Sequence, residues 1–248
     1  IGALDRPGRE SKPPALRFDR VWHELRDGPA ILRSVSLAIA PGERVALMGR
    51  NGAGKSTLLR HGAGLMKPTR GRVQSAGRVA LLLQNPTDYL VADTVAQEAS
   101  APALECAGLD PDAFADRHPR DLSGGEKQRL ALAIVLDDPS SSPAVVCLDE
   151  PTRGMDRGCK DELARFLSTI DAAVLVATHD PEFVALFAER VVLMADGAPI
   201  ADGPVAEVLS GGTYFATETA RILGGVGGAL TAEEGVALLT RTAQEAVA

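Results

Sequence analysis

The sequence predicts an α/β fold: a mainly parallel sheet covered by helices and extended by an antiparallel β addition. Short apolar runs such as Val45–Met48 and Ala144–Leu148 alternate with segments of helical periodicity, which is typical of parallel strands joined by helices. The first two strand candidates, Leu16–His23 and Val35–Ile39, are joined without a helix, which indicates antiparallel pairing. The chain has 248 residues and is 45% hydrophobic, enough to bury one core with a small subdomain.

Along the chain, residues 1–15 are rich in proline and charged residues and predict a linker or disordered lead. A folded domain is expected over residues 16–205. Within it, residues from about 94 to 120 look helical but contain three prolines, so a small helical subdomain is expected over about 88–136. The remaining expected strands are Arg72–Ser75, Val79–Leu83, Val174–Ala177 and Arg190–Met194, and the remaining expected helices are Glu126–Leu136, 159–168 and 181–188.

A C-terminal helical extension is expected over residues 206–248. Helical patterns occur at 204–209, 213–223 and 231–246. The run Gly224–Gly228 predicts a hinge between the last two, and Thr231 followed by acidic residues predicts the N-cap of the final helix.

Composition also limits the possible functions. The formal net charge is −7 and no long basic run occurs, so we expect no nucleic acid among the partners. The apolar runs are too short to span a bilayer. The three cysteines (Cys106, Cys147, Cys159) fit neither a disulfide framework nor a metal site, and a reduced cytosolic setting is the simplest account.

A glycine-rich loop follows the strand Val45–Met48 and precedes a helix, which is the context of a phosphate-binding loop. Its glycines let the backbone turn tightly and present N–H groups to an anion, and the helix dipole adds to the attraction. A plain glycine turn is the alternative, but the whole pattern matches. The sequence therefore predicts a P-loop NTPase core with ATP and Mg²⁺ as ligands, bound by Gly49, Arg50, Asn51, Gly52, Ala53, Gly54, Lys55, Ser56 and Thr57.

A second anion-binding turn is expected at the start of the helix near Glu126, where Ser123, Gly124 and Gly125 precede it. One ATP does not easily need two such turns in one chain, which indicates that the second serves a neighbour's nucleotide. With this motif, Leu122–Arg129, the chain resembles the ATP-binding cassette (ABC) ATPases, in which two cassettes stack head to tail and each signature turn (here Ser123–Glu126) seals the other's ATP.

The resemblance implies roles for further residues. Glu150 resembles the general base, Asp149 the carboxylate that holds Mg²⁺ through water, and His179 the switch histidine at the γ-phosphate. Gln84 matches the glutamine that senses Mg²⁺ and contacts a membrane partner, so Ser56, Gln84 and Asp149 form the expected metal set. The residues Gly154, Met155 and Asp156 match the loop that crosses the dimer interface.

Two positions depart from this family pattern. The place of the usual adenine-stacking aromatic ring is held by Leu25, so adenine rests on an aliphatic side chain or Trp22 swings in. Strand alternation puts Trp22 on the opposite face from Leu25, and ordinary core packing is the favoured role for the tryptophan. The second departure is Glu126, where glutamine is common.

Three segments resemble the energy-coupling-factor ATPases of this family: Gln84–Glu98, Asp149–Asp156 and the tail from Tyr214. This resemblance implies a subunit at the cytoplasmic face of the membrane that powers import of a vitamin or transition-metal ion. Its partners would be a second cassette, a transmembrane coupling protein and a substrate-binding membrane protein. Because the chain starts with Ile1 and a Pro/Arg-rich lead, we expect either the second half of a fused double cassette or a tagged or trimmed single subunit. Other ABC classes remain an alternative; a soluble ABC protein acting on ribosomes or DNA is disfavoured by the acidic charge.

Overall fold

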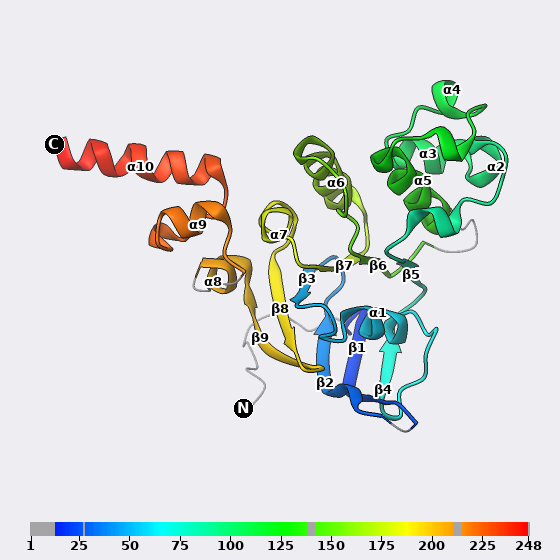
Figure 1. Cartoon of the computed structure of the whole chain (residues 1–248), viewed down its shortest axis with the longest axis horizontal. Helices are drawn as coiled ribbons and strands as arrows, with labels where there is room; N and C mark the ends of the chain where they lie inside the picture. Colours follow the sequence, from blue (N-terminus) through cyan, green and yellow to red (C-terminus); the bar gives the residue numbers. More distant parts are fainter. Residues whose placement is uncertain (1–12, 27, 138–141, 211–214, 248) are drawn as a thin grey trace.

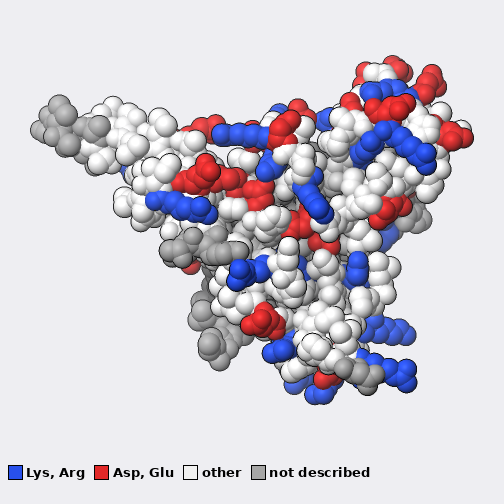
Figure 2. Space-filling model, viewed as in Figure 1, with Lys and Arg blue, Asp and Glu red and all other residues white. Residues whose placement is uncertain are grey.

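The structure is a computed structural model that describes residues 13–26, 28–137, 142–210 and 215–247. The expected lead over residues 1–15 therefore lies almost wholly outside the described residues. On the face seen in Figure 2, basic and acidic side chains are interspersed.

A six-stranded sheet forms the centre of the molecule (Figure 1), with strand order β5-β6-β7-β3-β8-β9. All neighbours pair in parallel except β8 and β9, which are antiparallel. The central strands β6 and β7 are buried along their whole length, as expected for parallel strands covered on both faces. The six strands are β3 (Arg44–Gly49), β5 (Val79–Leu82), β6 (Val145–Asp149), β7 (Ala173–Thr178), β8 (Arg190–Ala195) and β9 (Ala198–Pro204).

A separate three-stranded antiparallel sheet, ordered β2-β1-β4, confirms the predicted antiparallel addition. Its strands are β1 (Leu16–Glu24), β2 (Ala30–Ile39) and β4 (Arg70–Ser75), so the second strand begins five residues earlier than Val35. Irregular pairing in β1 coincides with Arg20 at a φ of 49°, a left-handed conformation typical of a bulge.

Two apolar layers hold the sheets together. Val45 and Leu47 of β3 pack with helix α1 (Lys55–Gly62) and the small sheet, and α1 lies between the two sheets (Figure 1). Ala46 and Met48 face the opposite layer, which contains α6 (Arg157–Thr169) and α7 (Pro181–Phe187). Because alternate residues of β3 are buried in the two layers, the strand is fixed on both faces. The loop that follows β3 therefore starts from a rigid point.

A group of short helices with its own apolar core follows β5. The prolines at 102, 111 and 119 each stand at one of the first two positions of a helix, where the missing N–H is not needed. The last helix of this group, α5, begins at Gly124, two residues before the predicted start at Glu126. The helices are η1 (Pro86–Tyr89), α2 (Val95–Glu98), α3 (Ala101–Cys106), α4 (Pro111–Phe114), η2 (Pro119–Asp121) and α5 (Gly124–Leu136).

The C-terminal part is helical as predicted, with two corrections. Strand β9 was not predicted, because Pro199 and the run Asp202-Gly203-Pro204 leave it without an apolar alternation. The helix expected over 213–223 begins only at Glu218, because Thr217 is its N-cap; residues 211–214 lie outside the described part. The run Gly224–Gly228 contains a short turn, and Thr231 caps the last helix by accepting a bond from Glu234 N at 3.3 Å. These elements are α8 (Val205–Ser210), α9 (Glu218–Ile222), η3 (Val226–Gly228) and α10 (Ala232–Val247).

The predicted fold class is confirmed: a P-loop type α/β core with a mixed sheet and surrounding helices. Within the described residues, no helix combines the length and the apolar character needed to cross a membrane.

Candidate nucleotide-binding site

The loop between β3 and α1 has two positions that only glycine fits. Gly49 has a φ of 151°, and a Cβ there would lie 2.4 Å from the Met194 carbonyl oxygen. Gly54 has a φ of 95°, and a Cβ there would lie 2.8 Å from Leu32 Cδ2. Both glycines therefore let the loop lie against β8 and β2 in a conformation closed to other residues. Helix α1 begins without a side-chain cap or an acidic residue in its first turn, which leaves its positive end uncompensated.

Lys55 is buried within this loop, with 6% of the residue exposed. Its ammonium donates to the carbonyl oxygens of Gly49 at 2.7 Å and Arg50 at 3.4 Å. The same nitrogen lies 3.8 Å from Glu150 Oε1. A buried ammonium needs such partners, and a phosphate oxygen is a stronger acceptor than a neutral carbonyl. The lysine is thus held where an anion in the loop would meet it.

Two adjacent carboxylates end β6, and their environments differ. Asp149 is 4% exposed; burial raises its pKa, while a hydrogen bond with Ser56 opposes the rise. Glu150 has a φ of 48°, an uncommon conformation for this residue, and its N–H donates to the Ala177 carbonyl at 2.8 Å. Strain of this kind persists only where the surroundings enforce it, and it turns the Glu150 side chain toward β7.

Residues at the end of β7 meet Glu150. His179 Nδ1 lies 2.8 Å from Glu150 Oε2, and Thr178 Oγ1 donates to the same oxygen at 3.4 Å. The Thr178 hydroxyl also accepts from Asp180 N at 3.1 Å, and Asp180 is bound in turn by Lys160 Nζ at 2.6 Å. The Glu150 carboxylate therefore lies between His179, Lys55 and the Thr178 hydroxyl. These contacts fix its orientation, as a general base requires.

These groups line one cavity of about 700 Å³. It brings together the phosphate loop from Asn51 to Thr57 with all three predicted catalytic residues, Gln84, Glu150 and His179. The lining residues are Ile31, Asn51, Gly52, Ala53, Gly54, Lys55, Ser56, Thr57, Gln84, Asp149, Glu150, Arg153 and His179.

The cavity suits a magnesium nucleotide. Ser56, Gln84 and Asp149 offer hydroxyl, amide and carboxylate oxygens, the hard ligands that Mg²⁺ prefers. The described residues contain no cluster of three or more His, Cys, Asp or Glu side chains that could hold a metal ion. A single carboxylate with a hydroxyl is the usual protein share for Mg²⁺ that is bound mainly by phosphates and water.

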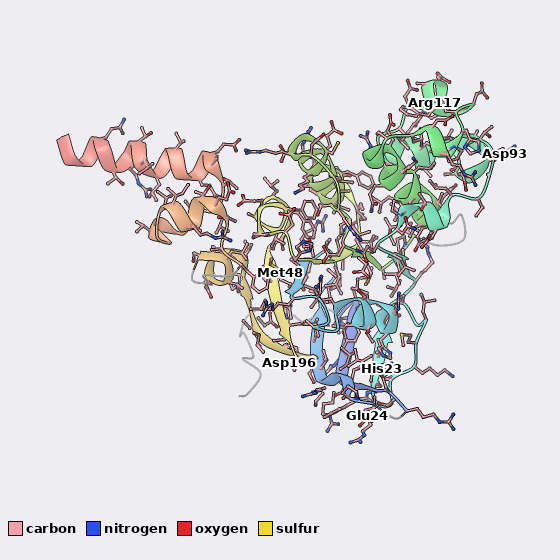
Figure 3. The ribbon with its side chains drawn as sticks, viewed as in Figure 1. His23, Glu24, Met48, Asp93, Arg117 and Asp196 are labelled. Atoms are coloured by element: carbon pink, nitrogen blue, oxygen red, sulfur yellow. The ribbon has the colours of Figure 1, made fainter. Side chains whose placement is uncertain are left out.

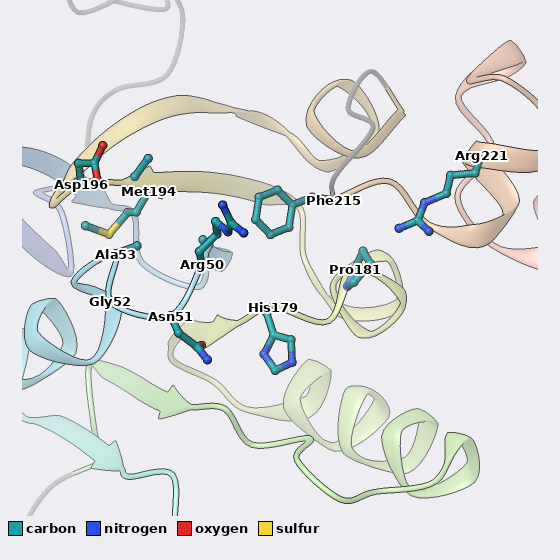
Figure 4. A pocket seen from close by; sticks show the side chains of 12 residues that line it. Arg50, Asn51, Gly52, Ala53, His179, Pro181, Met194, Asp196, Phe215 and Arg221 are labelled. Atoms are coloured by element: carbon teal, nitrogen blue, oxygen red, sulfur yellow. The ribbon is translucent and has the colours of Figure 1, made fainter.

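A larger hollow of about 1020 Å³ adjoins this cavity on the other side of the loop (Figure 4). The loop residues from Gly49 to Ala53 and His179 form one wall, and the C-terminal residues Phe215 and Arg221 form another. In Figure 4 the Arg50 guanidinium points toward the Phe215 ring. The sequence did not predict that the C-terminal extension would reach the phosphate loop.

The signature turn lies apart from this cavity. Among the described residues that line it, none belongs to Ser123–Glu126 or to Gly154–Asp156. Ser123 and Glu126 form a capping box: Glu126 Oε2 accepts from Ser123 N at 2.6 Å, and Ser123 Oγ accepts from Glu126 N at 3.3 Å. Burial raises the pKa of Glu126, but hydrogen bonds from Ser123 and the nearby positive charges outweigh it, so the pKa is lowered.

The predicted dimer loop leads into α6. Asp156 is the N-cap of this helix and accepts from Cys159 N at 2.9 Å. Gly154 has a φ of 76°, and Met155 packs on the main core. A Cβ on Gly125 would lie 3.2 Å from Cys159 Sγ, so the start of α6 touches the signature turn.

The strand geometry expected at Leu25 needs correction. β1 ends at Glu24, so strand alternation does not reach Leu25, which is 48% exposed and does not line the cavity. The Arg70 guanidinium lies over the Trp22 ring, with its Cζ atom 5.4 Å from the centroid of that ring. The aliphatic residue at the cavity wall is instead Ile31. A side chain that approaches a loop from another sheet leaves no local sequence signal.

The sequences of known ABC transporter ATP-binding proteins match most of this chain. A family model described as ABC transporter matches residues 32–153. An ABC transporter ATP-binding protein of Streptomyces coelicolor is 43% identical, over 88% of this chain and 43% of its own length. One from Gloeobacter violaceus is 38% identical, over 79% of this chain and 91% of its own length. The chain spans only about two fifths of two Streptomyces relatives, at 43% and 38% of their lengths.

Solved structures agree on the fold. The cbiO1 protein of Clostridium perfringens, part of the ABC transporter complex cbiONQ, is 27% identical with a TM-score of 0.72, over 79% of this chain and 91% of that chain. A bacterial Atm1-family ABC exporter with ATP bound is 23% identical with a TM-score of 0.70, over 86% of this chain and 43% of that chain. At 23% identity the exporter supports the fold alone.

Proposed function

The chain belongs to the ABC transporter ATP-binding proteins, and from this membership we propose that it is the ATP-hydrolysing cassette of an energy-coupling-factor importer. The convergence of Lys55, Asp149, Glu150 and His179 on one cavity is the observation that carries the hydrolytic part of the proposal. Cassettes of this family work as dimers with transmembrane partners.

In the proposed mechanism, Lys55 binds the β- and γ-phosphates through its ammonium. Ser56, Gln84 and Asp149 would hold Mg²⁺, which would supply charge neutralisation at the phosphates. Glu150 accepts a proton from the attacking water, and His179 orients the Glu150 carboxylate through the 2.8 Å contact. Ile31 forms the aliphatic wall on the adenine side.

The signature turn Ser123–Glu126 serves the nucleotide of a second cassette, while Gly154–Asp156 crosses the interface. This division is supported by the separation of both segments from the cavity that holds the catalytic groups. The partner cassette is a second chain or another part of the same polypeptide. The two Streptomyces relatives are more than twice as long as the matched segment, so a second cassette would fit in one polypeptide of that length.

The importer class is supported by the segments Gln84–Glu98 and Asp149–Asp156 and by similarity to cbiO1, whose complex contains other components. The proposed partners are a transmembrane coupling protein and a substrate-binding membrane protein, and the proposed cargo is a vitamin or a transition-metal ion. The cassette would then lie at the cytoplasmic face of the membrane.

Glu150→Gln tests the hydrolytic part. The variant keeps the shape of the carboxylate but cannot accept a proton, so turnover should fall roughly a hundredfold or more while ATP still binds. Steady-state hydrolysis and equilibrium ATP binding measure the two effects separately. Hydrolysis at the wild-type rate would overturn the assignment of the base.

A pull-down of tagged protein from native membranes, read by mass spectrometry, tests the transport part. A small membrane protein of the coupling type recovered with a second cassette supports an importer. Recovery of an exporter's membrane domain would indicate another ABC class, and recovery of ribosomes or DNA-repair proteins would contradict transport while leaving ATP hydrolysis intact.

A further inference from the structure

The hydroxyl of Tyr89 closes the loop that carries Gln84. The Leu83 N–H donates to Tyr89 Oη at 3.0 Å, and Tyr89 Oη donates to the Leu81 carbonyl at 3.0 Å. Leu83 is the residue immediately before Gln84. One side chain therefore satisfies two backbone groups at the end of β5 and ties them to a point six residues further along the chain.

The loop inside this closure is itself ordered by side-chain bonds. Asn85 Oδ1 accepts from the hydroxyl of Thr87 at 2.6 Å, and Asn85 Nδ2 donates to Asp88 Oδ1 at 2.7 Å. Asn85 is also the N-cap of η1, which ends at Tyr89. A loop held at both ends and braced in the middle has few conformations, so the backbone that carries Gln84 is fixed.

The closure joins two parts of the molecule. Tyr89 packs against the apolar layer that contains α6 and α7, while Gln84 lines the nucleotide cavity. The turn η1 contacts α5, the helix that begins with the signature residues. The tyrosine is thus the side chain through which the end of β5, Gln84 and the neighbourhood of α5 are held in one arrangement.

We propose that Tyr89 is a positioning residue: its hydroxyl fixes the backbone at Gln84 so that the glutamine side chain reaches the metal ion of the bound nucleotide. This inference rests on the proposed role of Gln84 as a magnesium ligand. Groups that orient a metal ligand from outside the coordination shell are needed for full metal affinity, although they never touch the ion.

Tyr89→Phe removes the hydroxyl and keeps the ring that packs on the core. We expect ATP affinity in EDTA to be unchanged. The factor by which Mg²⁺ strengthens ATP binding should fall by about tenfold, at the lower end of the losses seen when such supporting groups are removed. Calorimetry of ATP binding with and without Mg²⁺ gives both values on the full chain.

Amide hydrogen exchange supplies a second readout that does not involve the nucleotide. In Tyr89→Phe the Leu83 amide should exchange faster, because it loses its acceptor. Thr240→Val is the control, since it removes a hydroxyl that also donates to a backbone carbonyl, that of Val236 at 2.8 Å, but lies on α10. It should leave both the Mg²⁺ factor and Leu83 exchange unchanged.

Gln84→Ala separates this inference from the function on which it rests. If Gln84→Ala lowers the Mg²⁺ factor and Tyr89→Phe does not, the positioning role is overturned while the ligand role of Gln84 stands. If Gln84→Ala leaves the factor unchanged, both are overturned. Faster Leu83 exchange with an unaltered Mg²⁺ factor would show that the hydroxyl serves the loop's structure alone, which also contradicts the proposal.

Discussion

Two helices in this molecule begin with glycine-rich turns, and the structure gives the two turns opposite properties. The N-terminus of α1 has no side-chain cap and no acidic residue, and it opens onto the nucleotide cavity. The N-terminus of α5 is capped by its own Ser123 and Glu126, and its Glu126 carboxylate accepts a bond 2.6 Å long. One turn is ready for an anion from solution, and the other already holds an anion of its own chain.

The glycines differ in the same way. Gly49 and Gly54 have backbone angles that other residues rarely adopt, whereas a Cβ on Gly124 would meet nothing within 4 Å. The glycines of the phosphate loop are required by the fold of a single chain. The fold does not require Gly124, and the turn leaves open space for an approaching group, as expected if it completes a neighbour's site.

The largest expected contrast is between Gly49→Ala and Gly124→Ala. Gly49→Ala places a methyl 2.4 Å from a backbone oxygen and should lower the free energy of unfolding by about 3 kcal/mol. Gly124→Ala should leave stability equal or slightly higher, because alanine is the better helix former. Thermal or denaturant unfolding of both variants measures the contrast. Equal losses would mean that the two turns do not differ in this way.

Lysines near the two turns give the next contrast. Lys55→Ala removes the buried ammonium and should weaken ATP binding roughly 10- to 100-fold, the value of a charge-assisted hydrogen bond. Lys127→Ala, in the first turn of α5, is the control and should leave ATP affinity of the single chain unchanged. Equilibrium titration with ATP compares them, and an equal loss in both would remove the distinction between the sites.

Glu126→Gln tests whether the carboxylate at α5 opposes a partner's phosphate. Glutamine can keep the capping hydrogen bond, so stability should fall by only about 0.3–1 kcal/mol. ATP-dependent association should strengthen by about fivefold, since a negative charge leaves the place where a γ-phosphate would approach. Sedimentation at several protein concentrations measures the association. Weaker association in the variant would show that the charge helps closure.

The smallest expected effect is an acid dependence at the other end of α1. Burial lowers the pKa of His61, the Met66 carbonyl partly opposes this, and His23 lowers it further. The His61 Nε2 and His23 Nδ1 atoms lie 3.1 Å apart, and His23 stands on the small sheet (Figure 3). Because the folded pKa lies below the ordinary 6.5, the unfolded chain takes up the proton first.

The stability that neutral His61 contributes is therefore present above pH 6.5 and lost as the pH falls below it. Glu126 behaves differently, because its lowered pKa keeps its contribution intact until the pH falls below its ordinary 4.5. Unfolding measured between pH 7.5 and about 5 should show a modest loss that His61→Asn removes. A loss that persists in His61→Asn would assign the effect elsewhere.

The phosphate loop and its strand–loop–helix setting could be predicted because they depend on residues adjacent in sequence. The hairpin of β8 and β9 was missed although Asp196-Gly197, both with positive φ, is a strong hairpin signal. The start of α5 at Gly124 was equally readable from the Ser123–Glu126 capping box. The place of Ile31 at the cavity depends on how distant segments meet, so no local pattern records it. The Tyr89 bonds span only six and eight residues, but they depend on the three-dimensional path of the loop after β5, which has no sequence signature.

We propose that the α1 turn binds ATP while the α5 turn completes the site of a partner. Sedimentation of Glu150→Gln, and of the double variant that adds Gly124→Asp, tests it most directly. Gly124→Asp fits the open space at that position and places a charge where the partner's phosphate would lie. Both proteins should bind Mg–ATP equally, and only Glu150→Gln should double in mass. Equal dimerisation of both proteins would contradict this division of roles. A Glu150→Gln chain that stays monomeric at saturating ATP, both alone and with its partner cassette, would contradict it too.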